Sequence, residues 1–134
     1  MPAFSHQAGG VLTDRQIELL ISGMRVAWSK PNDFSSVQVP AYSASGSGDA
    51  ASGAHAYQTY CASCHGQDGA GGSAGSIIDP NFLNLVSDQG LRTTVVVGRS
   101  DLGKPDWRSN AAGHPMSPQE IEAVVAWIGS HRKN

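Results

Sequence analysis

The chain has 134 residues, of which 40% are apolar and 15% are charged, and its formal net charge is −2. This length and composition predict one folded domain and exclude a disordered acidic or basic chain. No run of basic residues occurs, which excludes nucleic-acid binding as the main function. Two cysteines are too few for a disulfide scaffold, and no apolar stretch approaches the roughly 18 residues of a membrane-spanning helix.

A first helix is predicted over residues 13–28. Thr13 and Gln16 have the spacing of a capping box, which marks the start of a helix. Apolar residues recur at helical spacing along one face: Ile17, Leu20, Ile21, Met24 and Trp28. We expect this face to be buried, on the rest of the protein or on a second copy of the chain, and Pro31 to end the helix.

Residues 29–48 are predicted to form a linker. They contain two prolines, eight serine or glycine residues and no hydrophobic period. A second helix is predicted from Asp49, its N-cap, to about Tyr60. Small residues on its expected buried face allow another helix to approach closely: Ala50, Gly53 and Ala54, with Tyr57.

The second half of the chain predicts further helices and no strand. Its shorter elements are a Gly-rich loop over 66–76 and two helices over 81–87 and 88–99. Valines 95–97 suit a strand equally well by propensity. The last helix, ending near His131, starts with a capping box formed by Ser117 and Glu120. The pattern predicts an all-α protein with long loops.

The motif that carries chemistry is Cys61-Ala62-Ser63-Cys64-His65. Cys-x-x-Cys-His is the attachment signature of c-type haem. Two thiols at this spacing can each reach one vinyl group of the same porphyrin, and His65 then lies under the iron. A thioredoxin-like redox pair is disfavoured because it needs a βαβ context. A zinc site is disfavoured because the chain lacks a second Cys or His pair at zinc-finger spacing.

Over about residues 46–131 the chain resembles a class I cytochrome c domain. The matching segments are GDAA before Tyr57 and Tyr60, then CASCHGQDGAGG, a loop that contains proline, and PQEIEAVVAWI. The resemblance implies an all-α class I cytochrome c fold, with helices and long loops around one covalent haem c per chain. In that family the helix before the haem motif crosses the last helix, so Gly53 and Tyr57 are expected to meet residues 123–127.

The resemblance also implies residues that support the haem. A backbone carbonyl near Asp79 and Pro80 is expected to accept a hydrogen bond from His65, which would orient the imidazole. Partners of the haem propionates are expected among three residues: Arg92, Arg99 and Trp107. An ordinary solvated position is an equally good interpretation of each arginine.

The start of the chain repeats its end. Residues 9–18 align with residues 113–122 without a gap, and Gly9, Ile17 and Glu18 recur there. With one residue of gap, residues 1–4 (MPAF) match residues 104–107 (KPDW). MPAF resembles the methionine-ligand loop of a class I cytochrome c. We therefore interpret 1–28 as a helical extension that resembles the tail of a preceding cytochrome domain, 29–48 as a linker and 49–134 as the cytochrome c domain.

The sixth iron ligand stays open at this stage. Met116 is favoured because it is the only methionine in the haem domain and because a neutral thioether suits a buried iron. Lys104 is the alternative, since the repeat places it at the expected ligand position, but its amine must first lose a proton. The repeat also pairs Met116 with Leu12, at a position that normally holds a packing residue before a helix. His114 is a third, weaker candidate.

The predicted function is a single-haem electron-transfer protein or domain that serves redox partner proteins, and not an enzyme. The alternative is a haem protein with an open or displaceable sixth position, acting as a ligand sensor or haem enzyme. No nucleic acid or membrane span is expected, and the first helix is a candidate for self-association. The first ten residues lack the features of a secretory signal, whereas the resemblance implies a periplasmic or other extracytoplasmic location.

Overall fold

The structure is a computed structural model that describes residues 3–29 and 37–133. Its contacts divide the chain into two units, Met1–Val39 and Pro40–Asn134, which are described separately. Every regular element among the described residues is a helix, which confirms the all-α prediction. No helix there is long and apolar enough to cross a bilayer.

The first unit contains a short 3-10 helix, η1 (His6–Ala8), and the helix α1 (Asp14–Trp28). The predicted capping box is present, because the Thr13 hydroxyl accepts from the Gln16 amide at 3.3 Å and the Gln16 side chain accepts from the Thr13 amide at 2.9 Å. These bonds satisfy backbone donors that the first turn leaves unpaired. Pro31, predicted to end this helix, lies outside the described residues.

The apolar face of α1 is exposed. Leu20 is 53% exposed and Met24 is 40% exposed, and Ile21 and Trp28 are exposed as well. Within the described part of this unit only η1 and a turn accompany α1, and neither is large enough to cover four turns of helix. The expected burial of this face on the rest of the protein or on a second copy of the chain stays a prediction.

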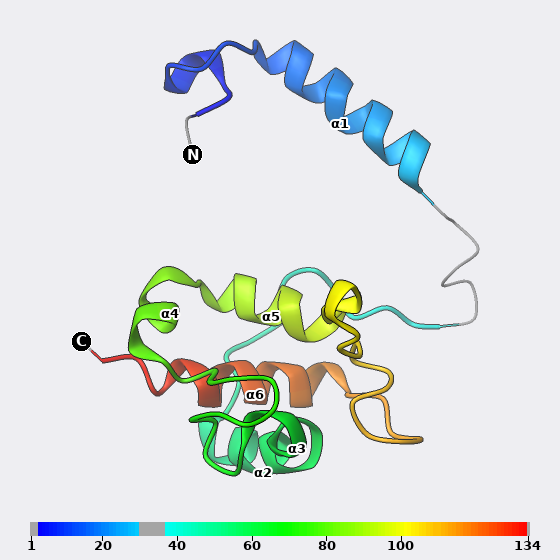
Figure 1. Ribbon diagram of the computed structural model, residues 1–134. Coiled ribbons are helices and arrows are strands. Elements are labelled where there is room, and N and C mark those ends of the chain that lie inside the picture. The colour runs from blue at the N-terminus through cyan, green and yellow to red at the C-terminus, as the bar shows by residue number, and fades with distance from the viewer. Residues whose placement is uncertain (1–2, 30–36, 134) are drawn as a thin grey trace. The chain divides into compact units, whose positions relative to one another are not determined.

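The second unit is built around the C-terminal helix α6 (Pro118–Gly129), which contacts both α2 (Ala50–Tyr60) and α5 (Asp88–Val97). Figure 1 shows α6 between them, with α5 on one side and α2 and α3 (Ala62–His65) on the other. Ile121 and Val124 of α6 are fully buried. The predicted capping box of Ser117 and Glu120 starts this helix.

The crossing of α2 and α6 follows the sequence prediction. Gly53 lies so close to the Ala123 carbonyl and the Trp127 side chain that a Cβ at this position would overlap both. The rings of Tyr57 and Trp127 stack with their centroids 4.1 Å apart. Tyr57 is completely buried, and its hydroxyl donates to the Gly66 carbonyl. This hydrogen bond connects the loop after the haem motif to the α2–α6 pair.

The two helices in the middle of the chain differ from their predicted bounds. Helix α4 (Pro80–Leu85) begins with Pro80 in its first turn, because the Asp79 side chain caps it by accepting from the amides of residues 81 and 82. Val86 is extended and ends it. Helix α5 includes valines 95–97, so tertiary packing overrides their strand propensity. The one-turn helix α3 and the 3-10 helices η1 and η2 (Ser100–Leu102) were not predicted.

Two leucines of α4 offer a matched test of this core. Leu83 is 1% exposed, whereas Leu85 is 89% exposed. We expect Leu83→Ala to lower the free energy of unfolding by about 3 kcal/mol, because it removes buried methyl groups and leaves a cavity. Leu85→Ala is expected to change it by less than about 0.5 kcal/mol. Denaturant unfolding of the two holoprotein variants measures both values, and equal losses would contradict the assigned burial of α4.

Candidate haem site

The Cys-x-x-Cys-His motif lies where two helices meet. Cys61 follows the last residue of α2, and its amide donates to the Tyr57 carbonyl at 2.9 Å. Cys64 and His65 belong to α3, whose His65 amide donates to the Cys61 carbonyl at 3.0 Å. Both thiols are free. The turn of α3 therefore places two sulfur atoms and one imidazole within a single helical turn.

All three motif residues line one cavity of about 310 Å³. This volume lies at the lower end of the roughly 300–1,000 Å³ that is typical of small-molecule and cofactor sites. The motif forms part of the wall, and α5 with the loop after it forms another part. The apolar lining comes from several elements: Ile77, Phe82, Leu91, Val95, Leu102 and Ile128. An apolar cavity with two free thiols and an imidazole in its wall fits a covalently attached haem.

The imidazole of His65 is oriented by the backbone. Its Nδ1 lies 2.8 Å from the Gly75 carbonyl oxygen. A carbonyl only accepts, so Nδ1 carries the proton and donates, which leaves Nε2 as the nitrogen with a free lone pair. Such a hydrogen bond fixes the tautomer and ring orientation of an iron-ligating histidine and raises its donor strength.

The carbonyl that accepts this hydrogen bond differs from the predicted one. The prediction placed it near Asp79 and Pro80, but the structure places it at Gly75. The reason is that Asp79 and Pro80 start α4. The Gly-rich loop folds back earlier, since the Gly71 amide donates to the His65 carbonyl at 3.1 Å and the Ala74 amide to the Cys64 carbonyl at 3.0 Å. No sequence signal distinguishes Gly75 from the other glycines of this loop.

The environment of the first cysteine keeps its thiol protonated. Burial, assisted by the neighbouring Cys64, raises the pKa of the Cys61 thiol to about 11. The thiolate is the nucleophilic form of cysteine, so at neutral pH Cys61 is a weak nucleophile before it is attached. A protonated thiol is less consistent with a reactive redox cysteine than with a cysteine that adds to a haem vinyl group.

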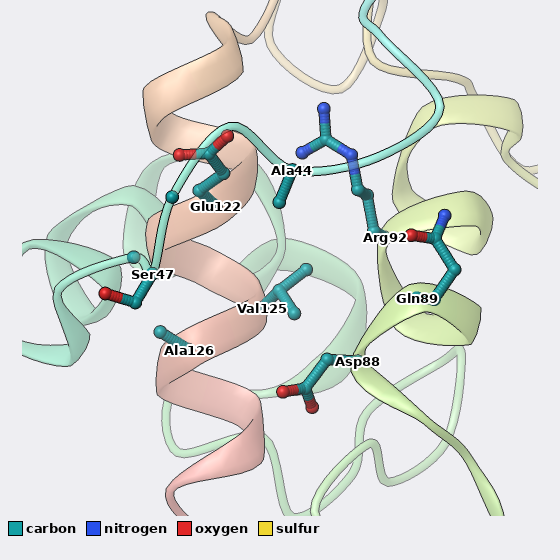
Figure 2. Close-up of a pocket in the computed structure, with 10 residues that line it drawn as sticks. Ala44, Ser47, Asp88, Gln89, Arg92, Glu122, Val125 and Ala126 are labelled. Carbon is teal, nitrogen blue, oxygen red and sulfur yellow. The ribbon is translucent and has the colours of Figure 1, made fainter.

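Arg92, predicted as a propionate partner, does not line the cavity that contains the haem motif, so its position gives that role no support. It is 3% exposed and lines a separate hollow of about 240 Å³ between α5, α6 and the segment before α2. Figure 2 shows its side chain extending from α5 towards the irregular segment that contains Ala44, with Glu122 on the α6 side. Its Nη2 donates to the Ala41 carbonyl at 2.9 Å, and its Nε donates to the carbonyls of Ala41 and Tyr42.

Helical geometry explains why Arg92 faces away from the cavity. Leu91, Thr94 and Val95 line the haem cavity and follow the i, i+3, i+4 spacing of one face of α5, and Gly98, which follows the helix, continues that spacing. Asp88, Gln89 and Arg92 occupy another face, which holds the segment before α2. There Gln89 donates to the Tyr42 carbonyl at 2.8 Å. On the α6 side, Glu122 accepts from the Ser45 amide at 2.8 Å.

Of the other predicted site residues, some line the cavity and some do not. Arg99 and Lys104 line the haem cavity, and Arg99 is paired with Asp101 at 2.8 Å. Trp107 and Met116 are buried, at 5% and 3% exposure, but neither is among the lining residues. Pro80 is also outside the lining.

Sequence reasoning missed most of the cavity wall. Phe82, Leu91, Val95 and Asn110 line it but were not singled out. The i, i+4 spacing of Leu91 and Val95 on a helix with a polar opposite face is a signal that could have found two of them. Asn110 lies in an irregular loop, for which periodicity offers no guide.

Comparison with known proteins is consistent with this geometry. A family model described as cytochrome C oxidase, cbb3-type, subunit III matches residues 48–128. The matched range includes the haem motif, the helices of the second unit except the last residue of α6, and all the residues that line the cavity among those described. No curated protein matches the chain.

Proposed function

Since this chain belongs to the family described as cytochrome C oxidase, cbb3-type, subunit III, and thus to the class I cytochromes c, we propose that its second unit holds one covalent haem c and passes single electrons between redox partner proteins. The observation that carries the proposal is that Cys61, Cys64 and His65 line one apolar cavity. Families of this type transfer electrons rather than catalyse a reaction on a substrate.

Each motif residue has a separate task in this proposal. Cys61 and Cys64 hold the haem through two thioether bonds, so the cofactor stays bound in both redox states. His65 supplies an iron ligand from Nε2, and the Gly75 carbonyl, 2.8 Å from Nδ1, keeps the ring in place. When bound, the haem supplies a reversible one-electron couple at its iron. The apolar wall excludes water and thereby limits the reorganisation that accompanies electron transfer.

The remaining proposals concern site, location and partners. Arg99 lines the cavity and is the retained candidate for a propionate contact. We place the natural protein outside the cytoplasm, in the periplasm or an equivalent compartment, as cytochrome c domains commonly are. The exposed apolar face of α1 makes self-association, or contact with another cytochrome domain, a reasonable expectation.

The test of this function is a redox titration of protein matured in a host that attaches haem c. We expect intact mass to increase by one haem per chain. We also expect the visible spectrum to change reversibly between two states along a one-electron curve. Protein purified from such a host without covalent haem would contradict the proposal. Covalent haem that cannot be reversibly reduced would also contradict it.

A ligand sensor is the second candidate, favoured by the absence of Met116 from the cavity lining. A thioether that stays outside the cavity leaves the sixth iron position to another group. Addition of carbon monoxide to the reduced protein separates the two functions. An unchanged spectrum supports an electron carrier with a firmly bound sixth ligand, whereas a large shift at low gas concentration supports the sensor.

A further inference from the structure

Lys104, the alternative sixth ligand of the sequence analysis, lies at the haem cavity. It lines the same cavity as Cys61, Cys64 and His65. Across residues 3–29 and 37–133 its amine makes neither a hydrogen bond nor an ion pair. Other polar groups of the wall are engaged, since Arg99 is paired with Asp101 at 2.8 Å and the Tyr60 hydroxyl donates to Glu120 at 2.9 Å.

The backbone holds Lys104 at this wall. Its amide donates to the Arg99 carbonyl at 2.9 Å, and its carbonyl accepts from the Arg99 amide at 3.3 Å, which closes an antiparallel bridge. Pro105 restricts the conformation of the residue before it to the extended region. Gly98 has a φ of +68°, and a Cβ there would overlap the Pro105 carbonyl, so the loop closes tightly against the end of α5. The backbone around Lys104 is thus held in a constrained turn.

Met116 is committed to packing elsewhere. Its side chain is 3% exposed and does not line the cavity. Its amide donates to the Trp107 carbonyl at 2.8 Å, and its sulfur lies 3.9 Å from the Asn110 side-chain amide. It immediately precedes Ser117, the N-cap of α6, and therefore occupies the first position of a hydrophobic staple with the fully buried Ile121. Drawing it towards the iron would disturb the start of α6.

The first unit repeats this arrangement with Leu12, a residue whose side chain has no atom that can ligate a metal. The Leu12 amide donates to the Phe4 carbonyl at 2.9 Å, as the Met116 amide does to Trp107, and Leu12 precedes the capping residue Thr13. Leucine cannot ligate a metal, so the position is served by a purely apolar side chain. Met116 therefore needs no ligand role to explain it.

Donor chemistry then narrows the choice of iron ligand within the cavity wall. The phenol oxygen of Tyr60 could also ligate iron, but its hydroxyl is engaged with Glu120 at 2.9 Å. Apart from the motif itself, the described lining contains a single side chain that can present a neutral nitrogen or thioether sulfur to iron, and that side chain is Lys104. An arginine stays protonated and an asparagine amide is a poor ligand for haem iron. We propose that Lys104, and not Met116, supplies the sixth ligand of the haem iron. This inference rests on the proposed haem function.

The experiment compares absorption spectra of ferric holoprotein variants. Met116→Leu is expected to retain the low-spin visible spectrum, and the wild type is expected to lack the thioether-to-iron charge-transfer band at the red end of the visible range. Lys104→Ala is expected to lose the low-spin spectrum completely. Lys104→Met is expected to gain the thioether band. Lys133→Ala, which removes an exposed lysine near the C-terminus, controls for the loss of one positive charge.

Three results would overturn the assignment: a thioether band in the wild type, its loss in Met116→Leu, or an unchanged low-spin spectrum in Lys104→Ala. Covalent haem is measured on every sample by intact mass, so the two proposals fail separately. Wild-type protein without covalent haem overturns the haem function itself. Protein with covalent haem and a Met116-dependent spectrum overturns only the ligand assignment.

Discussion

Replacing both Cys61 and Cys64 by alanine is expected to abolish covalent haem attachment completely. Both thiols are free and line the cavity beside His65, and no other cysteine exists in the chain. Haem held only by an axial bond is released by acid and organic solvent, whereas a thioether survives. The measurement is the haem content of the protein after acid–acetone extraction, together with intact mass. Each single variant is expected to keep one thioether and to show reduced haem content.

Ser63→Ala is the matched control for the cysteine variants. Ser63 lies between the two cysteines, is exposed and also lines the cavity, and its hydroxyl lies 3.9 Å from the Cys64 sulfur. This variant alters the same turn without removing a sulfur atom, so full haem content is expected. A double cysteine variant that still retains haem through extraction would refute the central assignment. A Ser63→Ala protein without haem would show that haem is lost because the turn is disturbed, and not because a thiol is removed.

Gly53→Val is expected to prevent the haem domain from folding stably. A Cβ alone at this position overlaps the Ala123 carbonyl and the Cβ of Trp127, and valine adds two methyl groups. Forced separation of α2 and α6 costs about 3 kcal/mol or more for overpacking, and loss of the Tyr57–Trp127 stack adds about 1 kcal/mol. This sum is close to the total stability of a small domain, about 5–15 kcal/mol. Thermal unfolding of the holoprotein measures the loss.

Gly23→Val provides the matched control for that substitution. Gly23 is also a helical glycine, in α1, but nothing lies within 4 Å of a Cβ built there. Valine is slightly better than glycine in a helix, so a change of less than about 0.5 kcal/mol is expected. Similar losses in the two variants would mean that glycine is required for helix formation in general and not for the close approach of α2 and α6.

Local sequence patterns were sufficient for the longer helices and for the haem motif. The capping boxes at Thr13 and Ser117 were predicted from spacing and are present, because such caps involve only residues three apart. The crossing of Gly53 and Tyr57 with α6 was anticipated from the family resemblance, and the structure contains it. The haem motif is equally local, since its two thiols and imidazole share one helical turn.

Contacts between distant segments were beyond the reach of these patterns. Arg92 was expected at a haem propionate, but rotation of α5 places it against Ala41 and Tyr42, about fifty residues away in the chain. The acceptor for His65 was expected near Pro80, but the return of a Gly-rich loop places it at Gly75. A helix pattern specifies which residues share a face, and only packing specifies what that face meets.

The sequence by itself determined that this chain is helical and that Ser117 starts the last helix. It also determined that Cys61, Cys64 and His65 have the spacing of a haem attachment motif. Each of these features depends on residues within one or two helical turns. Only the tertiary structure decided which side chains surround the cavity. It places Lys104 in the wall and Met116 in the core, although both are polarisable or basic donors in neighbouring loops. The physical reason is that the Arg99–Lys104 bridge and the Met116–Trp107 hydrogen bond are closed by backbone groups, which residue identity does not encode.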